Sequence, residues 1–242
     1  MQPSYSLARD PIFYVTVGFF AFLTTSLPTV IGQPNFLPIV QTVALFIFLL
    51  VPLRQGLIRE ALWVMALWLG IQFVAVTSLT WFLEARAERA FHDGFQYRMA
   101  YVAWFYRAAD VIRPDSFAAA PFSRLLELAG VLIGSLVSVG LLGVWFLVKS
   151  VNLAAYNMGV LLVALNSFTG LLLAIPLWSL LRIAGYAGLV ILLSEPGITG
   201  EWQPGHYWRT RQRLIITAGG LLLSGLLLEL FLPDLWRLLI SG

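Results

Sequence analysis

The residues of this sequence that are candidates for a chemical role are the charged side chains inside apolar stretches. The two candidates are Arg182 and Glu229, each within a run that is otherwise apolar. A charge in hydrocarbon is expensive, so such a residue marks an ion or substrate path or is paired with an opposite charge. Glu229 is close to the end of its run, where it could reach the interface or pair with Arg237. Arg182 either reaches the interface from the end of a helix or, if the helix continues past it, needs a partner such as Glu195 or Glu229.

Uncharged polar residues in apolar runs offer a second kind of site. Gln72, Asn166 and Thr169 could line a polar path through a membrane together with Arg182. Amides and hydroxyls in apolar helices also form hydrogen bonds between helices, which is their more frequent role. Both interpretations stay open on the sequence.

Motifs for catalysis and for cofactor binding do not occur in the sequence. The chain has no cysteine, which excludes a disulfide framework, a thiolate zinc site, an iron–sulfur cluster and a cysteine nucleophile. Its two histidines, His92 and His206, have no ligand spacing and lie outside the apolar runs, where a membrane haem would need them. We therefore expect no cofactor, no metal site and no enzymatic activity. An enzyme acting on lipids or isoprenoids would need an acid–base pair that the sequence does not offer.

The composition is that of an integral membrane protein. Hydrophobic residues make up 60% of the 242-residue chain, charged residues only 11%, and the mean hydropathy is +0.85, whereas about a quarter of the residues in a soluble domain are charged. The 15 basic residues, against 12 acidic ones, are arginines apart from Lys149 and cluster beside apolar runs. This distribution fits anionic phospholipid headgroups and not nucleic acid, for which a contiguous basic face is expected. We predict one polytopic membrane domain over residues 1–242, in the cytoplasmic membrane of a bacterium.

Apolar runs long enough to cross a bilayer predict an all-α fold of about six spans, with seven possible. The first run follows Arg9 and Asp10 and is about as long as a bilayer is thick, so we interpret it as a span and not as a cleaved leader. Pro34 and Asn35 follow it and predict a short turn to the second span. The predicted spans are 12–31, 36–53, 61–83, 125–148, 157–181 and 214–232.

Residues 157–194 are too long for one span, because as a helix they would extend about 57 Å against about 30 Å of hydrocarbon. Pro176 and Arg182 mark the candidate breaks. Two spans here would divide the cations evenly between the two faces, whereas one span gathers most of them on one face, as the positive-inside rule expects. We therefore favour six spans with both termini outside, which makes 183–193 a short re-entrant or interfacial segment near the cytoplasmic face.

The segment 86–113, between the third and fourth spans, is predicted to be an amphipathic interfacial helix. Its apolar residues recur at steps of three and four while most charges fall elsewhere, so the helix would lie along the bilayer surface or pack on the protein's own spans. The loop before the last span carries a second group of aromatic and basic residues, which are typical headgroup-level anchors. We predict that both segments form one cytoplasmic platform for lipid or a partner. Its residues are Phe91, Phe95, Met99, Val102, Phe105 and Arg107 in the helix and Trp202, Tyr207, Trp208 and Arg209 in the loop.

Small residues at four-residue spacing predict close contacts between helices. They are Gly130, Gly134 and Ser138 in the fourth span and Gly220 with Ser224 in the last one. Such faces let two helices approach closely, within one chain or between subunits.

The sequence favours a non-catalytic integral subunit, or an assembly or scaffold component, of a larger membrane complex. The small-residue faces and the aromatic and basic platform point to its partners: other integral membrane subunits or a second copy of the chain, and anionic lipid headgroups. The alternative is a small transporter or channel whose polar path includes Gln72, Asn166, Thr169 and Arg182.

Overall fold

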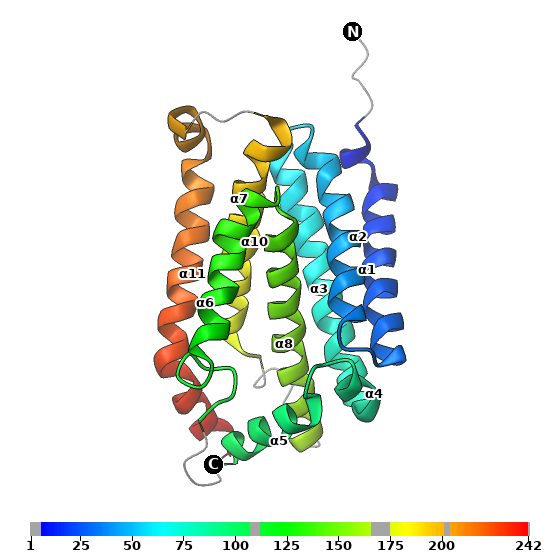
Figure 1. Cartoon of the computed structure of the whole chain (residues 1–242), viewed down its shortest axis with the longest axis vertical. Helices are drawn as coiled ribbons and strands as arrows, with labels where there is room; N and C mark the ends of the chain where they lie inside the picture. The colour runs from blue at the N-terminus through cyan, green and yellow to red at the C-terminus, as the bar shows by residue number, and fades with distance from the viewer. Residues whose placement is uncertain (1–5, 107–111, 166–174, 201–203, 242) are drawn as a thin grey trace.

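The chain forms a bundle of helices that run side by side (Figure 1). The computed structural model describes residues 6–106, 112–165, 175–200 and 204–241, without the side chains of 204, 206–208 and 238–241. In this part of the chain every regular element is a helix, and six of the helices are long and apolar enough to cross a membrane. The prediction of an all-α integral membrane protein is confirmed.

The elements follow the apolar runs of the sequence closely in the first third of the chain and depart from them later. In chain order they are η1 (Leu7–Arg9), α1 (Pro11–Ile31), α2 (Phe36–Leu53), α3 (Ile58–Phe82), α4 (Glu84–Arg89), α5 (Gly94–Phe105), α6 (Pro121–Ala129), the π-helical η2 (Gly130–Gly134), α7 (Ser135–Val137), α8 (Leu141–Leu165), α10 (Leu177–Thr199) and α11 (Pro204–Ser241).

Local sequence signals set the ends of the first helices. The Asp10 side chain accepts a hydrogen bond from the backbone N–H of Ile12 at 2.8 Å, which caps α1. The helix ends at Gly32, whose φ of 73° is a left-handed conformation that glycine adopts without strain. A few residues later α2 begins, so the predicted hairpin of the first two spans is present.

The predicted fourth span, 125–148, is not one helix. The chain turns at residues 138–140 between α7 and α8, where Gly140 has a φ of 102°. The hydroxyl of Ser138 accepts a hydrogen bond from the backbone N–H of Leu142 at 2.8 Å and so caps the start of α8. Because the turn consists of apolar and small residues and one serine that caps locally, the hydropathy of the sequence does not reveal it.

The predicted fifth span, 157–181, is also divided differently. Its first part belongs to α8, residues 166–174 lie outside the described residues, and Pro176 immediately precedes α10. The proposed break at Arg182 is wrong, because α10 continues through this residue, and the short apolar segment 183–193 lies within the same helix. The break belongs at Pro176, since the proline ring restricts the preceding residue and removes a backbone donor.

These two corrections change the topology. The segment from α6 to α7 runs along the bundle beside α8 and α10, in addition to the six long helices (Figure 1). As a result, the described chain starts at one end of the bundle and finishes at the other, and the predicted arrangement with both termini on one face is wrong. The end at which the chain starts carries η1 and the first turns of α11, and the opposite end carries α4 and α5.

The predicted interfacial helix, 86–113, is two shorter helices, α4 and α5, in its described part. They meet at Asp93, which has a φ of 53°, and α5 lies across the end of the bundle (Figure 1). Arg98 ties the two together through ion pairs of 2.5 Å to both Glu84 and Glu88.

The helices α10 and α11 approach each other closely. A Cβ atom added at Gly185 would lie 2.6 Å from the backbone nitrogen of Leu222, and one at Gly225 would lie 2.6 Å from the backbone nitrogen of Arg182. The facing residues on α11 include Ala218, so small side chains line the contact from both sides. We call this contact the α10–α11 seam.

A buried chain of amide and hydroxyl groups joins four helices at the other side of the bundle. Asn152 of α8 donates to Gln41 of α2 at 2.7 Å, and Gln41 donates to Thr25 of α1 at 2.8 Å. Gln72 of α3 donates to Asn152 at 2.8 Å and to the backbone oxygen of Val148 at 3.1 Å. These hydrogen bonds give Gln72 the interhelical role that was one of its two interpretations.

We expect Thr25→Val to weaken this amide chain. The substitution keeps the size of the side chain but leaves the buried amide of Gln41 without its acceptor, which should lower the free energy of unfolding by about 1 kcal/mol. Thr29→Val is the matched control, because the Thr29 hydroxyl donates only to the backbone of its own helix. Reversible unfolding by SDS in mixed micelles measures the difference, and equal stability of the two variants would contradict the assignment.

We expect Gly185→Ala to force the α10–α11 seam apart. The new methyl group would meet backbone atoms that cannot rotate away, and overpacking of this kind costs about 1–3 kcal/mol. Gly219→Ala should be neutral, because nothing lies within 4 Å of a Cβ atom added there. The melting temperatures of the two purified variants test this. An unchanged melting temperature for Gly185→Ala would contradict the close contact of the seam.

Candidate functional site

A cluster of buried charges lies where α6, α10, α11 and the segment before α6 meet. We call it the arginine–carboxylate cluster. Its three positive and three negative side chains are between 3% and 13% exposed. Its members are Arg113, Asp115, Arg124, Glu127, Arg182 and Glu229.

Glu229 is at the centre of the cluster. One of its carboxylate oxygens accepts a hydrogen bond from Arg113 at 2.8 Å and lies 3.5 Å from Nη2 of Arg124. The other oxygen accepts a hydrogen bond from Arg182. One side chain on α11 is therefore paired with three guanidinium groups from three other parts of the chain, and it can reach Arg182 because the seam brings the two backbones together.

Asp115 and Glu127 neutralise the remaining charge. Asp115 lies 2.7 Å from Nε of Arg113 and accepts a hydrogen bond from the Asn157 amide at 3.2 Å. Glu127 accepts from Arg124 at 2.8 Å, and its other oxygen accepts from the hydroxyl of Ser150 at 2.5 Å. Both Asn157 and Ser150 belong to α8, so the cluster also fixes α8 against α6.

Aromatic rings cover the arginines on the side of α5. The guanidinium of Arg113 lies 5.3 Å from the ring centre of Trp178 and 5.9 Å from that of Trp104. Arg237 lies 5.5 Å from the same Trp104 ring and donates to the Trp104 backbone oxygen at 3.0 Å. Contacts of this kind favour a cation that has left water.

Two tyrosines of α5 are held neutral next to the cluster. Burial raises the pKa of both Tyr97 and Tyr101 well above the ordinary value for a phenol, and the negative charge of Asp115 raises it further. Both phenols therefore keep their protons over the physiological pH range.

A cavity of about 690 Å³ opens onto the cluster. Arg113, Arg124, Arg182 and Glu229 form its polar side, and Arg237 with Asp234 lies further along α11 toward the end of the bundle that carries α5. The remaining wall is mainly apolar. Its leucines are Leu125 and Leu128 of α6 and Leu223, Leu226, Leu227 and Leu230 of α11.

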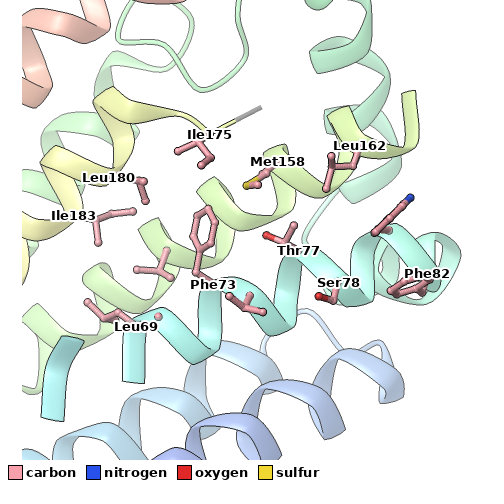
Figure 2. A pocket seen from close by; sticks show the side chains of 14 residues that line it. Leu69, Phe73, Thr77, Ser78, Phe82, Met158, Leu162, Ile175, Leu180 and Ile183 are labelled. Atoms are coloured by element: carbon pink, nitrogen blue, oxygen red, sulfur yellow. The ribbon is translucent and has the colours of Figure 1, made fainter. Parts of the chain in front are cut away.

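A second hollow, of about 680 Å³, is apolar (Figure 2). Figure 2 shows Phe73 from α3, Met158 from α8 and Ile183 from α10 around one space between the three helices. The hydroxyl of Thr77 faces the same region but donates to the backbone oxygen of Ala155 at 3.1 Å. This groove is suited to hydrocarbon and offers no charged group.

The predicted polar path is not assembled in the described residues. Gln72 is buried in the amide chain between α3 and α8, and Arg182 belongs to the arginine–carboxylate cluster. No hydrogen bond or ion pair joins these two residues within the described part of the chain. Asn166 and Thr169 lie outside the described residues.

The charged residues inside the apolar helices are paired with each other, which was one of the two interpretations of Arg182. Arg182 is 3% exposed and has Glu229 as its partner, while Glu195 instead pairs with Arg211. Pairing with Arg237, which was one of the two roles considered for Glu229, does not occur, because Arg237 lies beside Asp234 and Trp104.

The predicted aromatic face of α5 is only partly on the surface. Phe95 and Met99 are 58% and 52% exposed, and Val102 is half-buried. Phe105 is completely buried and Phe91 stacks on Tyr156 at 4.3 Å, so these two pack inside the protein. Phe91 is not part of this face, because it lies between α4 and α5, which are two separate helices.

The two parts of the predicted platform lie at opposite ends of the bundle, so they do not form one surface (Figure 1). Arg209 is exposed at the end where α11 begins. Arg107 and Trp202 lie outside the described residues, and the side chains of Tyr207 and Trp208 are not described either.

The two small-residue patterns have different roles. A Cβ atom added at Gly130 or Gly134 would lie 2.0 Å from Phe146 or 3.0 Å from Leu142, so this pattern packs on α8, while Ser138 forms the turn. Gly220 and Ser224 face away from the seam and are exposed, and nothing lies within 4 Å of a Cβ atom added at Gly220.

Sequence reasoning missed four members of the cluster: Arg113, Asp115, Arg124 and Glu127. Arg113 is at the end of the predicted interfacial helix and Asp115 in the loop after it. Arg124 falls just before the predicted start of the fourth span at residue 125, whereas α6 begins at Pro121. The spacing of Arg124 and Glu127, three residues apart at the start of an apolar run, is a local signal of an ion pair on one helix face. No local signal connects them to Glu229, more than a hundred residues away.

Comparison of the chain with protein-family models, with curated proteins and with solved structures finds no match. Within the described residues, no group of three or more histidine, aspartate or glutamate side chains is arranged to hold a metal ion.

We expect Glu229→Gln to destabilise the protein strongly. Removing one partner leaves buried guanidinium charge uncompensated, which typically costs about 3–5 kcal/mol. Asp234→Asn on the same helix should cost less than about 1 kcal/mol, because Asp234 is 71% exposed. The double variant Arg113→Gln/Glu229→Gln restores charge balance and should lose less than the sum of the single changes. Melting temperatures in detergent test this, and additive losses would show that the charges are not coupled.

Proposed function

We propose that the protein is a non-catalytic integral subunit, or an assembly component, of a larger membrane protein complex in the cytoplasmic membrane of a bacterium. One observation carries this proposal: the small-residue face of Gly220 and Ser224 on α11 is exposed, although the same helix uses Ala218, Leu222 and Gly225 to pack on α10.

The exposed face supports association because close helix packing in membranes depends on small residues. Gly220 and Ser224 are four residues apart and therefore lie on one side of α11, away from the seam. A helix of another subunit, or of a second copy of the chain, could approach α11 closely here. The exposed Phe95 and Met99 of α5 offer a second contact at the end of the bundle.

A small transporter or channel is the second candidate. The observation in its favour is the cavity beside Arg182, which differs from the path expected from the sequence because it lies between α6 and α11 and does not include Gln72. A substrate with a negative charge would be the expected cargo of such a cavity.

We expect Gly220→Ile to release the protein from its assembly. The larger side chain would keep a neighbouring helix away from α11, so native gel electrophoresis of a mild-detergent extract should show the variant migrating as the free chain. Gly70→Ile is the matched control, because Gly70 is also exposed within a span and a Cβ atom added there meets nothing within 4 Å.

Mass spectrometry of the co-migrating bands then identifies the partners. Defined partners that are lost with Gly220→Ile and retained with Gly70→Ile support the proposal. A parent protein that migrates as a lone monomer contradicts it and favours the transporter.

A further inference from the structure

We propose that the cavity beside the arginine–carboxylate cluster binds an anionic phospholipid from the surrounding bilayer. Its phosphate lies against the arginines and one acyl chain lies along the leucines of α11. The proposed association depends on Gly220 and Ser224, which do not line this cavity, so the inference does not depend on the proposed function.

The charges that face the cavity favour an anion. Four arginines line it, and only two carboxylates, those of Glu229 and Asp234, do so. Asp115 and Glu127, which balance the cluster as a whole, do not line the cavity. The cavity therefore presents an excess of positive charge, although the complete set of buried charges is neutral.

Arg113, which lines the cavity, has unused hydrogen-bonding capacity. Its side chain is 4% exposed, and its Nη1 atom has no hydrogen-bond partner within the described part of the chain. A buried guanidinium donor without an acceptor is unfavourable, and a phosphate oxygen would satisfy it with a charge-assisted hydrogen bond.

The apolar wall continues from the charges in the direction that an acyl chain requires. Along α11, Arg237 is nearest the end of the bundle. Leu230 lies seven residues before it, and Leu227 and Leu223 follow at steps of three and four toward the middle of the bundle. Residues at these steps lie on one helix face, and the leucines extend over about 10 Å at 1.5 Å per residue. A headgroup at the charged end would leave its chain pointing into the bilayer, as in a lipid leaflet.

The leucine wall is accessible from the bilayer. Leu223, Leu227 and Leu230 are 62%, 59% and 62% exposed, so an acyl chain could lie against them from the side. The cavity volume of about 690 Å³ is within the range typical of ligand sites, about 300–1,000 Å³.

The test measures lipid binding to the purified full-length chain in a neutral detergent by native mass spectrometry. The probe is dioleoyl-phosphatidylglycerol, dioleoyl-phosphatidylcholine is the lipid without net charge, and inorganic phosphate is the competitor. Leu230→Trp fills the cavity, and Ile216→Trp is its matched control, because Ile216 is 59% exposed on the same helix and does not line the cavity. Arg237→Gln removes a cation from the charged end.

We expect the parent chain to retain one phosphatidylglycerol and to bind it more tightly than phosphatidylcholine. Leu230→Trp and Arg237→Gln should each weaken binding about tenfold, which corresponds to the loss of one charge-assisted contact or of a similar packing energy. Ile216→Trp should bind as the parent does. Equal binding of both lipids, or phosphatidylglycerol binding that survives Leu230→Trp, would overturn the proposal. Phosphate that displaces the lipid at equal concentration would do so too, because the site would then recognise a free anion.

Discussion

The need to neutralise buried charge inside an apolar bundle governs the structure around Glu229. An unpaired guanidinium in such surroundings is strongly unfavourable, so Arg113, Arg124 and Arg182 must each find a carboxylate. Glu229 meets all three, and Asp115 and Glu127 complete the balance. Four parts of the chain are thereby held in one arrangement, and any shift of α11 would separate charges that are almost completely buried.

The glycines of the seam serve the same constraint. Glu229 can reach Arg182 only because Gly185 and Gly225 allow α10 and α11 to approach within backbone contact distance. The turn at residues 138–140 has a similar effect, since it lets the segment from α6 to α7 lie beside α8 and brings Ser150 and Asn157 to the carboxylates. Packing and charge pairing therefore depend on each other, which is typical of membrane helices, where hydrophobic burial contributes little to their association.

The proposed association with another helix and the proposed lipid site both involve α11, through different residues. One side is used in the seam. The opposite side carries the exposed Gly220 and Ser224 and, one to two turns further along, the leucines that line the cavity. The amide chain through Gln72 and Asn152 links helices on the other side of the bundle.

The sequence by itself determined the class of protein, the first three spans and the hairpin between the first two, because hydropathy, Asp10, Pro34 and Gly32 act through neighbouring residues. It also identified Arg182 and Glu229 as the charges that needed an explanation. Only the tertiary structure decided that they pair with each other, that Gly130 packs inward while Gly220 stays exposed, and that residues 125–148 contain a turn. A pairing over 47 positions depends on which helices become neighbours, and a turn built from apolar residues leaves no trace in hydropathy.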